Sequence, residues 1–438
     1  MSIDATSNVE LPASLAEVDR RFMTTLLRKD GMIDEADEVV SIEESGVGMT
    51  AGYFSDIKKI RCTYARSTDA ASSFVVKAWP AFELLPTEAL QALFVKDIAA
   101  YHMPVDRFYP RPRAILAEAD AANGRWGLVM EDADGFAEHK VRAELGVDDV
   151  MRMIPKLVDV VVAWEGCDRG DKAAELDALG VGLWAAEPNL QLYKSVMPGG
   201  AKLFDRVTSM ADSTLLNGRR WDDELGPGIC ELFTTRVDAF FAGTHPANGA
   251  TCTLSHGDLR GDNIFFCPPS ERYPDGWLCI DFQLMFRGPV PSDLAYLMGT
   301  GSVLPDVYAG ANLDRVLQAF YDAFMARTVV YPDYTFDQFR NEYATMSTTH
   351  FVYAVGMGAA IFQAGLANER AARVELGDAG ATEADLTPEE RRQRMWWRKM
   401  IANYCENFKT FDQYAQLQGL PANLDGLGPW TELPAHLC

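Results

Sequence analysis

Short apolar, β-type runs recur over the first third of the chain, and further on the apolar residues recur at helical spacing. Such short runs, bounded by turn residues, predict strands. Two segments in the first third instead carry an apolar stripe at helical spacing and are predicted as helices, about Leu15–Lys29 and Thr87–His102. The predicted strands cover residues 39–43, 57–64, 72–79, 115–118 and 126–130.

From Gly135 onward the pattern is mainly helical, with a return to short apolar strands at 251–283. The stretch 167–221 is mixed and contains several Pro and Gly residues, so we expect loops and short helices that vary with the substrate. The sequence therefore predicts two lobes, an N-terminal sheet lobe at 1–134 and a helical lobe at 135–438. The predicted helices of the second lobe cover 148–165, 228–243, 291–298, 313–329, 336–365 and 388–418.

Composition narrows the classes of partner. The 438 residues are 48% hydrophobic and 24% charged, as in an ordinary globular protein, and the net charge is −23. Nucleic acid and anionic membrane both require a basic surface, so neither is expected as a partner. The N-terminus lacks a signal sequence and no run approaches 18 apolar residues, so we expect a cytoplasmic protein. The eight cysteines show no metal-ligand spacing and are expected to be reduced thiols; the oligomeric state stays open.

Three polar residues at the ends of apolar runs carry the candidate chemistry. Asp258 is followed five residues later by Asn263, and Asp281 ends the next apolar run. Metal-assisted phosphoryl transfer needs such a set, one carboxylate to accept the proton of a hydroxyl and further oxygens to hold Mg²⁺ against the nucleotide phosphates. The sequence predicts Asp258 as the base, and Asn263 and Asp281 as metal ligands. The alternative is a simple turn at Asp258 and a strand-end cap at Asp281.

The motifs His256-Gly-Asp258…Asn263 and Asp281-Phe-Gln283 resemble those of the aminoglycoside phosphotransferase and choline kinase superfamily. With Asp293-Leu-Ala-Tyr-Leu downstream, the chain is most similar to the ecdysteroid-kinase-like group. This resemblance implies an α+β, bilobal protein-kinase-like fold: an antiparallel sheet lobe with one main helix and a larger, mostly helical lobe. It also implies MgATP as cofactor and a small-molecule alcohol as phosphate acceptor.

The same resemblance assigns phosphate-binding residues in the first lobe. Lys77 lies inside an apolar run, so its charge faces either solvent or a partner in the cleft. The resemblance implies that it meets the α- and β-phosphates. Gly46 and Gly48 belong to a glycine-rich turn whose backbone N–H groups could approach phosphates, although a plain hairpin turn has the same pattern.

The segment after the predicted strand 126–130 resembles the family's adenine-binding hinge. The resemblance implies that the backbone at Glu131 and Ala133 binds the adenine edge and that Met130 lies against its ring. From the residues themselves, the segment could equally be an edge strand that leaves a sheet.

Two further charged residues are candidates near the phosphates. Arg260 stands where Ser/Thr protein kinases carry a phosphate-contacting lysine, so it could offset charge on the γ-phosphoryl oxygens, or simply pair with Asp262 or another carboxylate. Asp97 stands in place of the family's glutamate, within the apolar stripe of the helix 87–102. An inward carboxylate needs a cation, and Lys77 is the nearest candidate. Alternatively Asp97 faces solvent, and Glu88 or Glu83 has that role.

These observations favour an ATP-dependent phosphotransferase that acts on a small-molecule hydroxyl. A nucleotide-binding pseudokinase or regulatory protein is the first alternative. A protein Ser/Thr kinase is the second, although no Ala-Pro-Glu triplet follows Asp281. The sequence does not name the acceptor, and it leaves open the choice between ATP and GTP.

Overall fold

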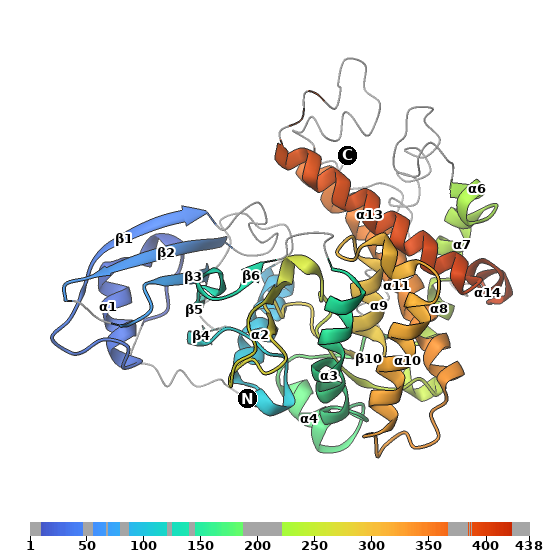
Figure 1. The fold of residues 1–438 in the computed structure, drawn as a ribbon, viewed down its shortest axis with the longest axis horizontal. Helices are drawn as coiled ribbons and strands as arrows, with labels where there is room; N and C mark the ends of the chain where they lie inside the picture. The colour runs from blue at the N-terminus through green and yellow to red at the C-terminus, as the bar shows by residue number, and fades with distance from the viewer. Residues whose placement is uncertain are drawn as a thin grey trace. The chain divides into compact units, whose positions relative to one another are not determined.

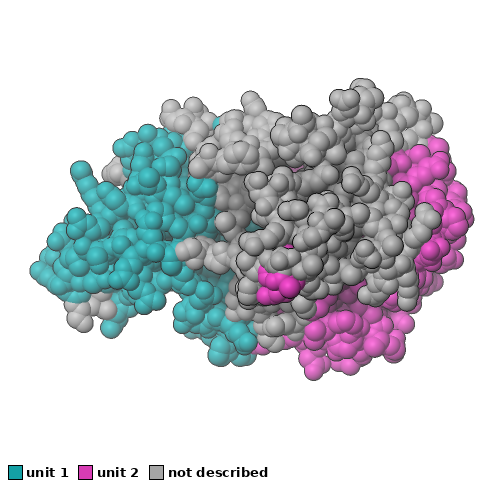
Figure 2. All heavy atoms as spheres, turned by 90° about the horizontal axis from the view of Figure 1, so that it is seen from above, with its two compact units in different colours: residues 1–139, 174–181, 263–285 teal, residues 140–173, 182–262, 286–438 magenta. Residues whose placement is uncertain are grey.

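The structure is a computed structural model, in which the chain forms two compact units (Figure 2). Unit 1 comprises residues 1–139, 174–181 and 263–285, and unit 2 comprises 140–173, 182–262 and 286–438. The predicted division near residue 134 stays a prediction. The residues that the structure describes are 10–46, 56–66, 69–78, 87–120, 125–139, 145–186, 221–366, 384, 386 and 388–422.

A five-stranded antiparallel sheet forms the centre of unit 1 (Figure 1). In the order β1-β2-β3-β5-β4, strand β3 lies in the middle of the sheet, between β2 and β5. Each strand corresponds to a predicted one, with bounds that extend it by one to three residues or trim it by one. The strands are β1 Val39–Gly46, β2 Asp56–Tyr64, β3 Ser73–Ala78, β4 Ala114–Asp120 and β5 Arg125–Glu131.

One helix packs on each face of this sheet. Helix α1, Arg20–Lys29, shares a hydrophobic cluster with Phe74 and Val76 of β3, whereas α2, Thr87–His102, shares another with Leu128 and Met130 of β5. The prediction of one helix at Leu15–Lys29 is partly wrong, because residues Leu15–Glu17 form a separate 3₁₀ turn, η1. The Asp19 side chain accepts a hydrogen bond from the Phe22 N–H and starts a new helix at Arg20.

Unit 1 also contains a small three-stranded sheet. Its strands are β6 Glu138–His139, β8 Ile264–Phe266 and β9 Trp277–Cys279, in the order β6-β8-β9. Two of these strands carry the polar residues predicted as metal ligands at their ends. Short 3₁₀ turns in this unit are η2 Val105–Arg107 and η4 Ala133–Gly135.

Unit 2 is mainly helical, with one two-stranded sheet of β7 Thr253–Ser255 and β10 Phe286–Gly288. Helices α6, α7, α8, α11, α13 and α14 contribute to a hydrophobic cluster of this unit. The predicted helix at 228–243 is two helices, because the backbone of Arg236 leaves the helical conformation. The helices in chain order are α3 Val147–Ala163, α4 Gly170–Ala178, α6 Trp221–Leu225, α7 Ile229–Thr235, α8 Val237–Gly243, η5 Pro246–Asn248, η6 Gly261–Asn263, α9 Ser292–Gly299, η7 Pro305–Tyr308, α10 Asn312–Met325, α11 Phe336–Leu366, α13 Pro388–Thr410 and α14 Gln413–Gly419.

The α+β fold class predicted from the sequence is confirmed. An antiparallel sheet, on which the main helix α2 packs, precedes a mostly helical part of the chain. The expectation of reduced thiols stays a prediction. In the part of the chain that the structure describes, no disulfide includes any of Cys62, Cys167, Cys230, Cys252, Cys267, Cys279 and Cys405. Among the described helices, none combines the length and apolar character needed to cross a membrane.

Candidate active site

Lys77 in unit 1 makes two ion pairs at once. It lies on the central strand β3, and its Nζ is 3.0 Å from Asp97 Oδ2 on α2 and 3.1 Å from Asp281 Oδ1 beyond β9. The other oxygen of Asp97 accepts the Phe282 N–H at 3.0 Å. The predicted pairing of Asp97 with Lys77 is confirmed. Asp97 is also attached to the backbone that follows Asp281, which the sequence did not predict.

Burial makes this network electrostatically strong. Lys77 is 2% exposed and Asp97 is fully buried, whereas the Asp281 side chain is 27% exposed. Burial alone would lower the pKa of Lys77, but attraction to Asp281 and Asp97 outweighs it and raises that pKa above its ordinary value of 10.5. Lys77 therefore stays a cation across the neutral pH range. A fixed buried cation of this kind suits phosphate oxygens, which carry the opposite charge.

The pairing of β8 with β9 brings Asn263 and Asp281 to the same end of a hairpin. Ile264 pairs with Cys279, and one step beyond, the Asn263 carbonyl accepts the Ile280 N–H at 3.0 Å. Asp281 follows directly, with a φ of +71°. Aspartate tolerates this left-handed conformation better than bulky residues do, and such backbone strain recurs at functional sites. Asn263 and Asp281, the two predicted metal ligands, therefore lie at the same end of the β8–β9 pair in unit 1.

The donors of Asn263 and Asp281 suit Mg²⁺, because amide and carboxylate oxygens are the hard ligands that this ion prefers. Across the described residues, no group of three or more His, Cys, Asp and Glu side chains could form a complete metal cage. Mg²⁺ in nucleotide sites needs no such cage, since one or two protein ligands act together with phosphate and water oxygens. The residues present therefore fit the predicted ion.

The predicted hinge residues lie at the end of β5 and in η4. Met130 is 2% exposed in the cluster between sheet and α2, and its Sδ accepts a hydrogen bond from the Tyr101 hydroxyl at 3.3 Å. The Glu131 carboxylate forms an ion pair with Arg272 at 2.8 Å and borders a cavity of about 560 Å³ within unit 1. Ala133 is buried at the first position of η4. Their contact with adenine stays a prediction.

The glycine-rich turn is described in part. Gly46 is the last residue of β1, where it pairs with Lys58 of β2, and Gly48 lies outside the described residues. The structure therefore places the start of this turn at the end of the β1–β2 pair, and its role at the phosphates stays a prediction.

In unit 2, the loop after β7 is held through its backbone. Asp293, on the first turn of α9, accepts the His256 N–H at 2.8 Å and the Gly257 N–H at 3.1 Å. Gly257 has a φ of +83°, a conformation that side chains with a Cβ rarely adopt. This requirement is a physical reason for glycine between His256 and Asp258. The loop delivers Asp258 in one backbone conformation, 8% exposed.

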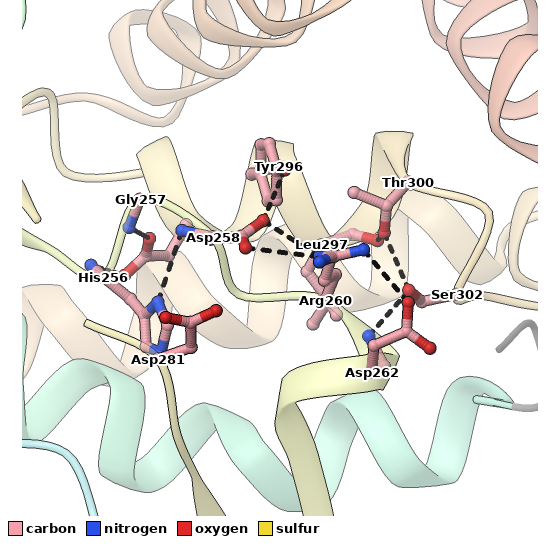
Figure 3. A network of polar contacts seen from close by, with 12 residues as sticks. His256, Gly257, Asp258, Arg260, Asp262, Asp281, Tyr296, Leu297, Thr300 and Ser302 are labelled. Atoms are coloured by element: carbon pink, nitrogen blue, oxygen red, sulfur yellow. Dashed lines mark hydrogen bonds and ion pairs between the residues drawn. The ribbon is translucent and has the colours of Figure 1, made fainter. Parts of the chain in front are cut away.

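The Asp258 carboxylate contacts the side chains of Arg260 and Tyr296 (Figure 3). Arg260 Nε lies 3.1 Å from Asp258 Oδ1, and the Arg260 Nη1 lies 3.0 Å from Asp262 Oδ2. The Tyr296 hydroxyl donates to Asp258 Oδ1 at 2.6 Å. The alternative considered for Arg260, a pair with Asp262, is therefore present, but Arg260 also contacts the predicted base. Its contact with phosphate stays a prediction.

Sequence reasoning missed three residues that hold this loop. Asp293 appeared only as part of a resemblance, Tyr296 was given no role, and Ser302 was not considered although its Oγ accepts the Gly261 N–H at 2.7 Å. One signal was available, because Asp293 and Tyr296 are three residues apart and share one face of a helix. The Ser302 contact follows from the path of the chain after α9 and has no sequence signal.

Comparisons with known proteins support the resemblance that the motifs predicted. Residues 190–329 match the family described as the Ecdysteroid kinase-like family. The match covers less than half of the chain but includes Asp258, Asn263, Asp281 and Asp293. No curated protein gives a match.

Solved structures of aminoglycoside phosphotransferases are also similar. Wild-type aminoglycoside 2′-phosphotransferase-IIIa in its GDP complex aligns with a TM-score of 0.40 and 14% identity, over 77% of this chain and 91% of that chain. An aminoglycoside phosphotransferase from Streptomyces rimosus, in complex with ADP and streptomycin, aligns with a TM-score of 0.35 and 19% identity, over 75% of this chain and 97% of that chain.

Proposed function

We propose that this chain is an ATP-dependent phosphotransferase that transfers the γ-phosphoryl group of ATP to a hydroxyl group of a small molecule. The observation that carries this proposal is the buried Lys77, whose ammonium group joins Asp97 on α2 to Asp281 at the end of the β8–β9 hairpin. The ion pair with Asp281, a predicted metal ligand, fixes the position of the positive charge of Lys77. The match to the ecdysteroid kinase-like family supports the same type of reaction.

In this proposal the first unit binds the nucleotide. Lys77 contacts the α- and β-phosphates, and Asp97 keeps its ammonium group in place. Gly46 and Gly48 let backbone N–H groups approach phosphate oxygens, and the segment Met130–Ala133 borders the adenine. Asn263 and Asp281 hold Mg²⁺, which when bound neutralises the charge of the β- and γ-phosphate oxygens.

The loop of unit 2 acts on the acceptor. Asp258 orients the acceptor hydroxyl and takes its proton as the acceptor oxygen bonds to the γ-phosphorus. The bond from that phosphorus to the bridging oxygen breaks in the same step, and ADP leaves with that oxygen. Arg260 offsets the negative charge that develops on the transferred phosphoryl oxygens. Because the reaction needs little covalent chemistry from the protein, fixed placement of these groups provides most of the rate.

The test is transfer of label from γ-labelled ATP, with Mg²⁺, to a panel of sterols, amino alcohols, sugars and aminoglycosides. We expect a phosphorylated product from at least one class. In Asp258→Asn, turnover should fall roughly 10²–10⁴-fold, while nucleotide affinity measured by fluorescence titration stays within about twofold. Asp333→Asn is the matched control, because it removes the same charge from an exposed position of unit 2.

Other outcomes point to the alternatives. Nucleotide binding without turnover across the whole panel would favour a regulatory nucleotide-binding protein. Label on protein acceptors would favour a protein kinase. Near-normal turnover in Asp258→Asn would show that Asp258 is not the base.

A further inference from the structure

The hydroxyl of Tyr296 is directed at the carboxylate proposed as the catalytic base. It donates a hydrogen bond to Asp258 Oδ1 at 2.6 Å, the shortest of the contacts to this carboxylate described above, which are 3.1 Å or longer to Arg260 (Figure 3). A hydrogen bond of an uncharged hydroxyl to a carboxylate is short and stronger than one between two neutral groups. Tyr296 therefore restrains the Asp258 carboxylate through a short, charge-assisted hydrogen bond.

The phenol keeps its proton at any pH at which the enzyme would work. Burial, together with the negative charge of Asp258, raises the pKa of Tyr296 well above its ordinary value of 10.0. A phenol that does not ionise is a permanent donor here. It cannot act as the acid or base itself, so its contribution is to orientation.

Helix α9 provides a rigid support for this contact. Asp293 and Tyr296 lie three residues apart on α9, so they share one face of the helix, and both contact the loop with Asp258. Asp293 holds the backbone of that loop and Tyr296 holds its side chain. The Tyr296 ring in turn packs edge-on against the buried His350 ring, with centroids 5.0 Å apart and planes at 80°.

Without the Tyr296 hydroxyl, the Asp258 carboxylate keeps the Arg260 guanidinium among its described partners. That guanidinium is shared with Asp262, so rotation of the Asp258 side chain toward Arg260 would form better contacts on that side. A base turned in this way presents its oxygens at the wrong angle to an acceptor hydroxyl. Small errors of this kind reduce the rate because reacting atoms must meet within a narrow range of angle and distance.

We propose that Tyr296 is a positioning residue for phosphoryl transfer, which fixes the orientation of the Asp258 carboxylate through its hydroxyl and thereby sets the turnover rate. This inference rests on the proposed role of Asp258. Nothing in the family match or in the sequence motifs assigns such a role to Tyr296.

The first experiment measures the hydrogen bond directly. Tyr296→Phe removes the hydroxyl and keeps the ring packed on His350, so the ultraviolet resonance Raman difference between wild type and this variant isolates the Tyr296 signal. We expect the intensity ratio of its tyrosine ring doublet to report a strong hydrogen-bond donor, and to change in an Asp258→Asn background. A Tyr296 signal typical of an acceptor or of a weak donor, unchanged by Asp258→Asn, overturns the proposal.

The second experiment separates orientation from general stability. In Tyr296→Phe we expect kcat for MgATP turnover, measured as phosphate release with water as the acceptor, to fall about tenfold, with the KM for ATP within twofold of wild type. Tyr343→Phe is the control, because Tyr343 is a buried tyrosine of unit 2 whose hydroxyl bonds Asn407 at 3.0 Å, outside the loop with Asp258. It should lower the melting temperature comparably and leave kcat unchanged.

The outcomes distinguish this inference from the proposed function. If Asp258→Asn is inactive but Tyr296→Phe turns over at the wild-type rate, Tyr296 is a structural residue and the inference fails alone. If Asp258→Asn keeps near-normal turnover, the proposed function fails, and the Raman measurement still decides whether Tyr296 restrains that side chain. Equal losses of kcat in Tyr296→Phe and Tyr343→Phe would also overturn the inference, because they would reflect lost stability.

Discussion

Replacement of Asp97 tests whether the buried network of unit 1 is one energetic unit. Both oxygens of Asp97 are engaged, one by the Lys77 ammonium at 3.0 Å and the other by the Phe282 N–H at 3.0 Å. Asp97→Ala removes both acceptors from a fully buried position. Lys77 then depends on Asp281 alone, and the Phe282 N–H loses its described acceptor.

The expected loss of stability in Asp97→Ala depends on the ion pair with Asp281 that Lys77 keeps. Removing one partner of a buried ion pair generally costs about 3–5 kcal/mol, because the other charge is left uncompensated. Lys77 keeps Asp281 at 3.1 Å, and the Asp281 side chain is more than a quarter exposed, so we expect the lower part of that range, about 3 kcal/mol. If the ammonium group moves toward Asp281, MgATP affinity should fall about tenfold, or about 1.4 kcal/mol.

The assay is a double-mutant cycle of Lys77→Ala, Asp97→Ala and the double variant, read by MgATP affinity and by urea denaturation. We expect a coupling energy of at least about 1 kcal/mol, because each single change already breaks the same ion pair. The exposed pair Arg125–Glu10 of unit 1, 2.7 Å apart, is the matched control, and its coupling should be about 0–1 kcal/mol.

The pH of the assay should not matter over the neutral range. The folded-state pKa of Lys77 is raised above 10.5, so its stabilising contribution is fully present below that value and is lost only as the pH rises through the folded-state pKa. We expect the same coupling at pH 6 and pH 9. Strictly additive losses of affinity and stability would refute the reasoning and show that Asp97 and Lys77 act independently.

Three further predictions concern single residues. Asp281→Asn should weaken MgATP binding and turnover together and raise the Mg²⁺ concentration that half-saturates activity; an unchanged Mg²⁺ titration would exclude Asp281 as a ligand. Arg260→Ala should lower kcat at least about tenfold, and a loss under about threefold, which is less than 1 kcal/mol, would show that Arg260 is only a partner of Asp262. Burial lowers the pKa of His350 from 6.5 to about 3, so below pH 6.5 the unfolded chain binds a proton that the folded chain does not, and stability falls with falling pH. Between pH 7 and pH 5 this contribution is about 2 kcal/mol, and urea denaturation of His350→Gln should show a pH dependence weaker by that amount; an equal dependence in both proteins would contradict it.

The local pattern of apolar and polar residues was enough to predict much of the secondary structure of unit 1. Short apolar, β-type runs predicted all five strands of the main sheet, and the apolar stripe predicted α2 at Thr87–His102. The same stripe predicted that Asp97 faces inward and needs a cation, because a buried carboxylate without one is strongly unfavourable. Periodicity did not predict where a helix stops: the pattern from Leu15 continues to Lys29, but the Asp19 cap divides the segment.

Other features depend on contacts between residues far apart in the chain. Lys77 and Asp281 are 204 residues apart, and the spacing of a motif carries no information on which oxygen meets which donor. The two-residue strand β6 is too short for any pattern, and it exists because β8 offers a neighbouring edge. Tyr296 looked like one more aromatic residue of a helix, since hydrophobic periodicity records which side of a helix is buried. What its hydroxyl meets on that side, the Asp258 carboxylate, is decided by the packing of α9 against the loop after β7, because hydrogen bonds depend on distance and angle between specific atoms.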